Sequence, residues 1–211
     1  GNYTVTVTDQ KGCFTTRDTT VLEPDALLIS SMSMDSASCN GVADGTATAN
    51  GITGGNGINS FSWNTTPLQT TNPATGLAAG NYTVTVTDQK GCFTTRDTTV
   101  LEPLLLAVDT AFQDSVSCNG LIDGSASILG AGGNGIYSYL WSDGQTTATA
   151  SNLTAGTYNV TITDQKGCFK DTSVTVLEPN VLEIDTTAQD SVTCNGLFDG
   201  SASVSIIGGN G

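Results

Sequence analysis

The sequence predicts an all-β fold built from tandem β-sandwich repeats arranged head to tail. Three observations support this prediction. Thr, Ser, Gly and Val dominate the 211 residues and only 12% are charged, which is typical of β proteins. The heptapeptide Thr-Asp-Gln-Lys-Gly-Cys-Phe begins at Thr8, Thr87 and Thr163. Between these copies lie short segments of alternating apolar and polar residues bounded by turn signals.

The cysteines give the period of the repeat. Successive cysteines of each set are 79 and then 76 residues apart, the two sets being Cys13, Cys92, Cys168 and Cys39, Cys118, Cys194. A fixed period of this length indicates a repeat architecture. The sequence predicts two complete repeats, 25–103 and 104–179, between the C-terminal part of a preceding repeat, 1–24, and the N-terminal part of a following one, 180–211. We therefore expect a segment of a longer array.

Composition and charge exclude several classes of function. The net charge is −14 and the chain has no histidine, so binding to nucleic acid phosphates is not expected. The acidity either attracts divalent cations or only keeps an extracellular protein soluble. The chain has no apolar run of the ~20 residues that a membrane span needs. Without histidine there is no Ser-His-Asp or Cys-His pair, so we expect no enzyme and no catalytic residue.

The alternation in each repeat marks its strands. In the segment 81–87, Tyr82, Val84 and Val86 point to one face and the intervening residues to the other. That segment belongs to the first repeat. In the second repeat the expected strands are marked, in order, by Leu106 with Val108, Ala126 with Ile128, Tyr139 with Trp141, the segment 147–150, Tyr158 with Val160, and Val174 with Val176.

Six or seven short strands in a unit of this length predict a β-sandwich of immunoglobulin type. We expect Trp141 and Trp63 to lie in the core, because Trp141 alternates in phase with Tyr139. The alternative is a tryptophan that binds sugar. The Leu-x-x-Gly-x-Tyr sequence at 153–158 suits the tyrosine corner of such sandwiches.

The repeated heptapeptide is expected to join the last two strands of a repeat. Gly91 can take the positive φ that closes a short hairpin loop, and Asp88 can accept hydrogen bonds from the backbone of the turn. The Gly-Gly-Asn-Gly sequences at 54–57, 132–135 and 208–211 are also interpreted as turns between strands.

Four stretches of the second repeat resemble the SprB repeat. They are Ser-Cys-Asn-Gly-x-x-Asp-Gly at 117–124, Gly-Gly-Asn-Gly-x-Tyr-x-Tyr-x-Trp at 132–141, Leu-x-x-Gly-x-Tyr at 153–158 and Thr-Asp-x-x-Gly-Cys at 163–168. The resemblance implies a repeat of long, secreted, cell-surface adhesins of the Bacteroidota, gliding adhesins included, exported by type IX secretion. The first repeat departs from the pattern at Asn59 and Phe61 but keeps Trp63.

Each complete repeat has two cysteines, Cys39 with Cys92 and Cys118 with Cys168, which predicts disulfides in a small extracellular unit. We favour a bridge within the repeat, Cys39–Cys92. It would close a loop of about 50 residues and contribute roughly 4 kcal/mol. It requires that the first strand bends or that the strand order departs from the standard one. Standard topology instead separates these cysteines by a strand length. It predicts Cys39–Cys168, with Cys92 and Cys118 paired outside this segment.

Recurring acidic residues suggest a calcium site where successive repeats meet. The predicted ligands are Asp44, Glu102 and Asp164, because Ca²⁺ takes six to eight oxygen ligands. The alternative roles are turn capping for the two aspartates and solvation for Glu102. No cofactor is otherwise required.

Short Asp-Ser/Thr triplets resemble the O-glycosylation signal of secreted proteins in the same bacterial group. The residues that would carry the glycan are Ser36, Thr98, Ser115 and Ser191. Three of them recur at one position of the repeat, namely Ser36, Ser115 and Ser191.

We therefore expect an extracellular or cell-surface structural stalk. Its partners would be adjacent repeats of the same chain and, in a filament, other copies of the chain. The alternative is a repeated module that binds surface glycans through exposed aromatic residues such as Tyr137 or Phe112.

Overall fold

A computed structural model describes residues 1–210. Within this range the regular secondary structure consists of sixteen β-strands. The chain divides into two compact units. Unit 1 comprises Gly1–Ala37 and Gly41–Glu102, and unit 2 comprises Ser38–Asn40 and the chain from Pro103 onward. The all-β prediction is confirmed.

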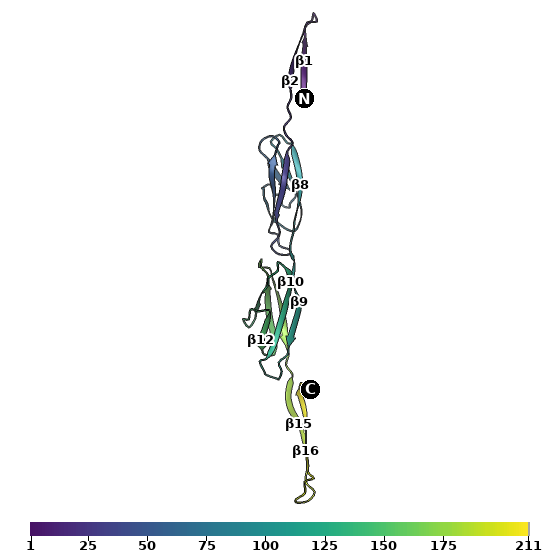
Figure 1. Cartoon of the computed structure of the whole chain (residues 1–211), viewed down its shortest axis with the longest axis vertical. Helices are drawn as coiled ribbons and strands as arrows, with labels where there is room; N and C mark the ends of the chain where they lie inside the picture. The colour runs from purple at the N-terminus through teal and green to yellow at the C-terminus, as the bar shows by residue number, and fades with distance from the viewer. Residues whose placement is uncertain (211) are drawn as a thin grey trace. The chain divides into compact units, whose positions relative to one another are not determined.

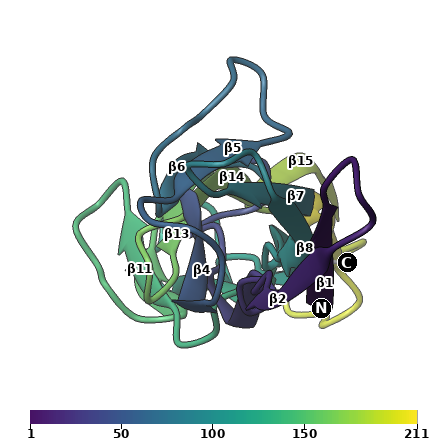
Figure 2. The ribbon, with the colours of Figure 1, turned by 90° about the horizontal axis from the view of Figure 1, so that it is seen from above.

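Unit 1 contains a hairpin and a sandwich of two three-stranded sheets. One sheet has the order β3-β4-β6 and the other β5-β7-β8, and Figure 2 shows β5, β7 and β8 following one another in one layer. The strands are β1 (Asn2–Thr8), β2 (Phe14–Thr20), β3 (Leu28–Asp35), β4 (Gly45–Thr53), β5 (Ser60–Trp63), β6 (Ala74–Leu77), β7 (Gly80–Thr87) and β8 (Phe93–Val100).

Unit 2 repeats this plan with the hairpin at its other end. Its sheets have the orders β12-β10-β9 and β11-β13-β14, and β15 pairs with β16, as the two-stranded ribbon in Figure 1 shows. The strands are β9 (Leu104–Asp114), β10 (Gly124–Gly133), β11 (Ser138–Trp141), β12 (Thr149–Leu153), β13 (Gly156–Thr163), β14 (Phe169–Val176), β15 (Asn180–Asp190) and β16 (Ser201–Gly209).

Both sandwiches have the immunoglobulin-like order that the alternation predicts, with the first, second and fourth strands facing the third, fifth and sixth. Trp63 and Trp141 are buried in the two cores, so the sugar-binding alternative for them is wrong. Each indole N–H donates to a backbone carbonyl, that of Thr71 or Thr147. The expected tyrosine corner is present, because the Tyr158 hydroxyl donates to the Thr154 carbonyl.

Burial in the core depends on the opposing sheet as well as on the sequence. Val84 and Val86 of β7 are fully buried, whereas Val5 and Val7 of the identical strand β1 are 55% and 62% exposed. The hairpins β1–β2 and β7–β8 share the same register. Local sequence therefore determines the hairpin, and packing against a second sheet determines the burial.

Candidate functional site

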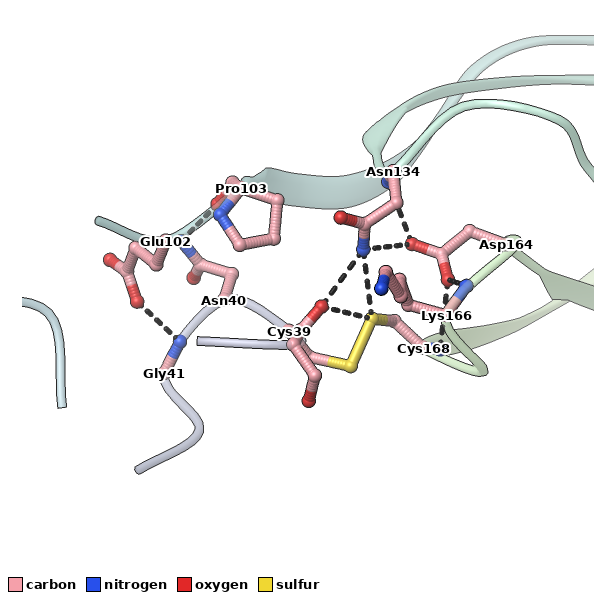
Figure 3. The surroundings of a disulfide bond; sticks show 10 residues. Cys39, Asn40, Gly41, Glu102, Pro103, Asn134, Asp164, Lys166 and Cys168 are labelled. Carbon is pink, nitrogen blue, oxygen red and sulfur yellow. Dashed lines mark hydrogen bonds between the residues drawn. A yellow bond between two sulfur atoms is a disulfide. The ribbon is translucent and has the colours of Figure 1, made fainter. Parts of the chain in front are cut away.

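A disulfide joins Cys39 of the first sequence repeat to Cys168 of the second (Figure 3), with Cα atoms 5.7 Å apart. Both cysteines belong to unit 2. The favoured bridge within the repeat, Cys39–Cys92, is therefore wrong, and the pairing that standard topology predicts is confirmed.

The backbone explains why Cys39 does not meet Cys92. Ala37 N–H donates to the Leu101 carbonyl at 2.8 Å, so the chain enters the cysteine turn beside the far end of β8. Cys92 directly precedes β8, a strand of eight residues that spans about 26 Å. Disulfide formation requires Cα atoms within ~7 Å.

The second repeat keeps its cysteines apart in the same way. Val116 N–H donates to the Leu177 carbonyl at 3.0 Å, just beyond the end of β14. Cys168 lies immediately before the first residue of β14. A bridge within the repeat would require the first strand to bend toward the loop, and the strand does not do so.

Asp164 organises the loop that carries Cys168. Its Oδ1 accepts hydrogen bonds from the N–H groups of Lys166 and Cys168 at 2.9 and 3.0 Å. Its Oδ2 accepts from the backbone N–H and from the side-chain Nδ2 of Asn134, at 2.8 and 3.0 Å. The predicted turn-capping role of this aspartate is confirmed. The loop closes at Gly167, whose φ is +88°, as expected for a bulged hairpin loop.

Asn134 links this loop to the turn that carries Cys39. Its Nδ2 donates to the Ser38 carbonyl at 2.8 Å and lies 3.5 Å from Cys168 Sγ, as the dashed lines in Figure 3 show. Gly133 makes this approach possible, because a Cβ there would lie 2.6 Å from Asp164 Oδ2. Asn134 was not singled out from the sequence, although its Gly-Gly-Asn-Gly context occurs three times.

The hydrogen bonds keep Asp164 ionised. Burial raises the pKa of its carboxyl group, but donors from Asn134, Lys166 and Cys168 more than offset this, so the pKa lies below the ordinary value of 3.8. In unit 1 the same opposing effects lower the pKa of Asp88 to about 2, its side-chain donor being Asn56. A carboxylate that accepts several N–H groups is a fixed anchor for a loop.

Four cysteine thiols are unpaired among the described residues, namely Cys13, Cys92, Cys118 and Cys194, and all four are exposed. Cys92 and Cys118 were also predicted to form disulfides, and their pairing outside this segment stays a prediction.

The structure does not assemble the predicted calcium ligands. Residues 1–210 contain no group of three or more acidic, Cys or His side chains placed to hold a metal ion. Glu102 accepts the Gly41 N–H at 2.7 Å, and Glu178 accepts the Gly120 N–H at 3.2 Å in the second repeat. Asp44 is exposed. Calcium binding by Asp44, Glu102 and Asp164 stays a prediction.

The predicted glycosylation residues differ in accessibility. Ser36, Ser115 and Ser191 are exposed and each directly follows a strand, β3, β9 or β15. Thr98 is half-buried in β8, opposite Tyr82 of β7. O-glycosylation stays a prediction, and the geometry favours the three serines.

The two aromatic residues proposed for glycan contact have different environments. Tyr137 packs against the core of unit 2 and its hydroxyl donates to the Gly132 carbonyl at 2.7 Å. Phe112 is 66% exposed on β9. Separately, the described residues include no helix that is long and apolar enough to cross a membrane.

These features define a class of protein, the tandem β-sandwich repeat with a disulfide between successive sequence repeats. The family model described as SprB repeat matches residues 110–146. The matched segment includes Cys118 and Asn134, so the expected resemblance is confirmed by an independent comparison.

Other comparisons found less. No curated protein matches the sequence. Among solved structures, the chain is similar to the crystal structure of Down Syndrome Cell Adhesion Molecule (DSCAM) isoform 1.30.30, N-terminal eight Ig domains, with 15% identity and a TM-score of 0.31. That similarity covers 74% of this chain and 23% of the DSCAM chain.

Proposed function

We propose that this chain is a structural segment of a cell-surface, adhesin-type repeat protein and that it carries mechanical tension. The observation that carries the proposal is the Cys39–Cys168 disulfide between successive sequence repeats. The SprB match and the sandwich fold support an extracellular role, and disulfides persist in oxidising compartments. Export by type IX secretion belongs to the same proposal.

The position of the disulfide has a direct mechanical consequence. Tension applied to the two ends of the chain passes from Cys39 to Cys168 through the sulfur–sulfur bond. The intervening residues, spanned by a sequence separation of 129, are thereby shielded from the load. Fully extended, that stretch would add about 430–460 Å. A covalent bypass of this kind lets a stalk bear force without extension of the bridged residues.

Single-molecule force spectroscopy of the full chain, held by its two ends, tests the proposal. Under oxidising conditions we expect unfolding to release no length from residues 40–167. Reducing conditions should release that length, up to about 430–460 Å less the folded distance between the two cysteines.

A matched variant separates the cross-link from a general effect of reductant. Cys92→Ser removes an exposed, unpaired thiol and should behave like the parent chain, whereas Cys39→Ser should show the released length even when oxidised. Equal released lengths for the oxidised parent chain and Cys39→Ser would refute the role of the bond in carrying tension.

Glycan binding is the second candidate function, and the exposure of Phe112 is the observation that favours it. Tyr137 contributes less, because its hydroxyl and ring are engaged within unit 2. A glycan array probed with the full chain, with Phe112→Ala as control, tests this function. Binding that Phe112→Ala abolishes supports it, and no binding by the parent chain rejects it.

A further inference from the structure

Unit 1 contains a second copy of the arrangement that holds Cys168 in unit 2. Asp88 Oδ2 accepts from the backbone N–H and from Nδ2 of Asn56 at 2.8 and 3.0 Å. These distances equal those between Asn134 and Asp164. Asp88 Oδ1 accepts the N–H groups of Lys90 and Cys92, both at 2.9 Å. The site is therefore formed in advance of any cross-link.

The two copies differ only in what they hold. In unit 2 the side-chain amide of Asn134 has the Ser38 carbonyl as an acceptor, and Cys168 is bonded to Cys39. In unit 1 the Asn56 side-chain amide donates to Asp88 Oδ2, and its Nδ2 lies 4.0 Å from Cys92 Sγ. No carbonyl among residues 1–210 takes the place of Ser38 there, and Cys92 is an exposed thiol.

A third position shows that the amide contact does not need the disulfide. In unit 2, Asn210 Nδ2 donates to the Ser117 carbonyl at 2.6 Å, the same donor and acceptor types as Asn134 and Ser38. The adjacent Cys118 is unpaired. Cys118 and Asn210 line a cavity of about 400 Å³, so there is room beside the thiol. Recognition of the Ser-Cys turn by asparagine can therefore precede bonding of the sulfurs.

We propose that Asn56, Asp88 and Cys92 form a docking site for the Ser-Cys-Asn-Gly turn of another SprB repeat. The Asn56 amide donates to the carbonyl of the incoming serine, which places the incoming cysteine against Cys92. The occupant is assigned from the filled site, where Ser38 and Cys39 of such a turn take these two places. The inference rests on the proposed function and names the partner of its second cross-link.

The covalent step that follows docking is a thiol oxidation. Two thiols lose two protons and two electrons and form one sulfur–sulfur bond. An external disulfide accepts the electrons and is released as two thiols. Asn56 takes no part in this chemistry. It acts as a positioning residue that raises the local concentration of one thiol beside the other.

The full chain contains a control for this proposal. Cys13 lies in a loop with the same sequence as the Cys92 loop, and Asp9 Oδ1 accepts the Lys11 and Cys13 N–H groups at 2.9 Å, as Asp88 does for its loop. In the described part of the chain, the Cys13 loop lacks the side-chain amide partner and also the opposing sheet, so Asn56→Ala isolates the contribution of the amide. The probe is a peptide that copies residues 35–46, with its cysteine activated as a mixed disulfide with an aromatic thiol. Because the two loops have the same sequence, the chain is cleaved after glutamate, at Glu23 and Glu102. The two cysteines then lie in peptides of different mass, and mass spectrometry locates the probe on Cys13 or Cys92.

We expect the peptide to react with Cys92 about two to ten times faster than with Cys13, the factor that one hydrogen bond contributes. Asn56→Ala should remove this preference, and Asn134→Ala, which changes only the filled site, should leave it intact. Equal rates at Cys13 and Cys92 in the parent chain would overturn the inference without any variant. An absent preference together with an intact force bypass would reject the docking site and leave the proposed function standing.

Discussion

Asn134 donates a hydrogen bond to the carbonyl oxygen of Ser38, 96 residues earlier in the sequence, at 2.8 Å. The same side-chain amide donates to Asp164, whose other carboxylate oxygen holds the N–H of Cys168. The contact therefore joins the turn before Cys39 to the loop before Cys168 through one side chain. Both cysteines are positioned by hydrogen bonds that are independent of the sulfur–sulfur bond.

Replacing Asn134 should slow the formation of the Cys39–Cys168 disulfide. In Asn134→Ala the Ser38 carbonyl loses its donor, so the two thiols spend less time in contact. We expect reoxidation of the reduced, folded chain to be about two to ten times slower, measured by trapping free thiols and mass spectrometry. Asn56→Ala, which alters the equivalent residue of unit 1, should reoxidise this pair at the parent rate. Identical rates for both variants would contradict the positioning role.

Removing the disulfide should destabilise unit 2. The bond closes a loop with a sequence separation of 129, and loss of a native disulfide typically costs about 2–5 kcal/mol of unfolding free energy. Urea unfolding of the variant with both Cys39→Ser and Cys168→Ser should show this loss in the near-ultraviolet signal of the buried tryptophans, Trp63 in unit 1 and Trp141 in unit 2. Cys92→Ser should unfold with the parent chain, and a parent-like midpoint for the double variant would count against the prediction.

The sandwich could be predicted because the alternation of apolar and polar residues within each strand indicates which face is buried. Tyr82, Val84 and Val86 alternate with polar residues, and the structure places all three toward the core of unit 1. The hydrogen bonds from the loop backbone to Asp88 could be predicted for a similar reason, since an aspartate before a glycine turn has few other partners for its oxygens. Both features depend on neighbours in sequence, which a single chain displays.

The cross-link and its asparagine depend on distant neighbours. The favoured pairing, Cys39 with Cys92, failed because the strand order decides at which end of the sandwich each cysteine lies. Asn134 looked like one more turn residue, because the Ser38 carbonyl that it binds is supplied by the preceding repeat. The signal that identifies it is recurrence, since Asn56 and Asn210 occupy the same place in Gly-Gly-Asn-Gly.

Acidification should destabilise unit 1 through Asp88. Its folded pKa of about 2 lies below the ordinary value of 3.8, so the folded state favours the ionised form. The resulting stability is fully present above pH 3.8 and is lost as the pH falls from 3.8 toward 2. Urea midpoints measured across this range should decline less steeply for Asp88→Asn than for the parent chain. Unit 2 should keep its own decline in both proteins, because the pKa of Asp164 is lowered as well. Parallel pH profiles for the two proteins would contradict the assignment.

A methyl group at Gly133 should disturb the anchor of the disulfide more than one at Gly135. Both glycines have positive φ, +58° and +67°, so alanine pays a similar backbone cost at either position. A Cβ at Gly133 would lie 2.6 Å from Asp164 Oδ2, whereas a Cβ at Gly135 meets nothing within 4 Å. Asp164 cannot move aside without breaking its bonds to Asn134. We expect Gly133→Ala to lose about 1–3 kcal/mol more unfolding free energy than Gly135→Ala. Equal losses in urea unfolding would show that the Asp164–Asn134 pair yields freely, and that it does not anchor the loop.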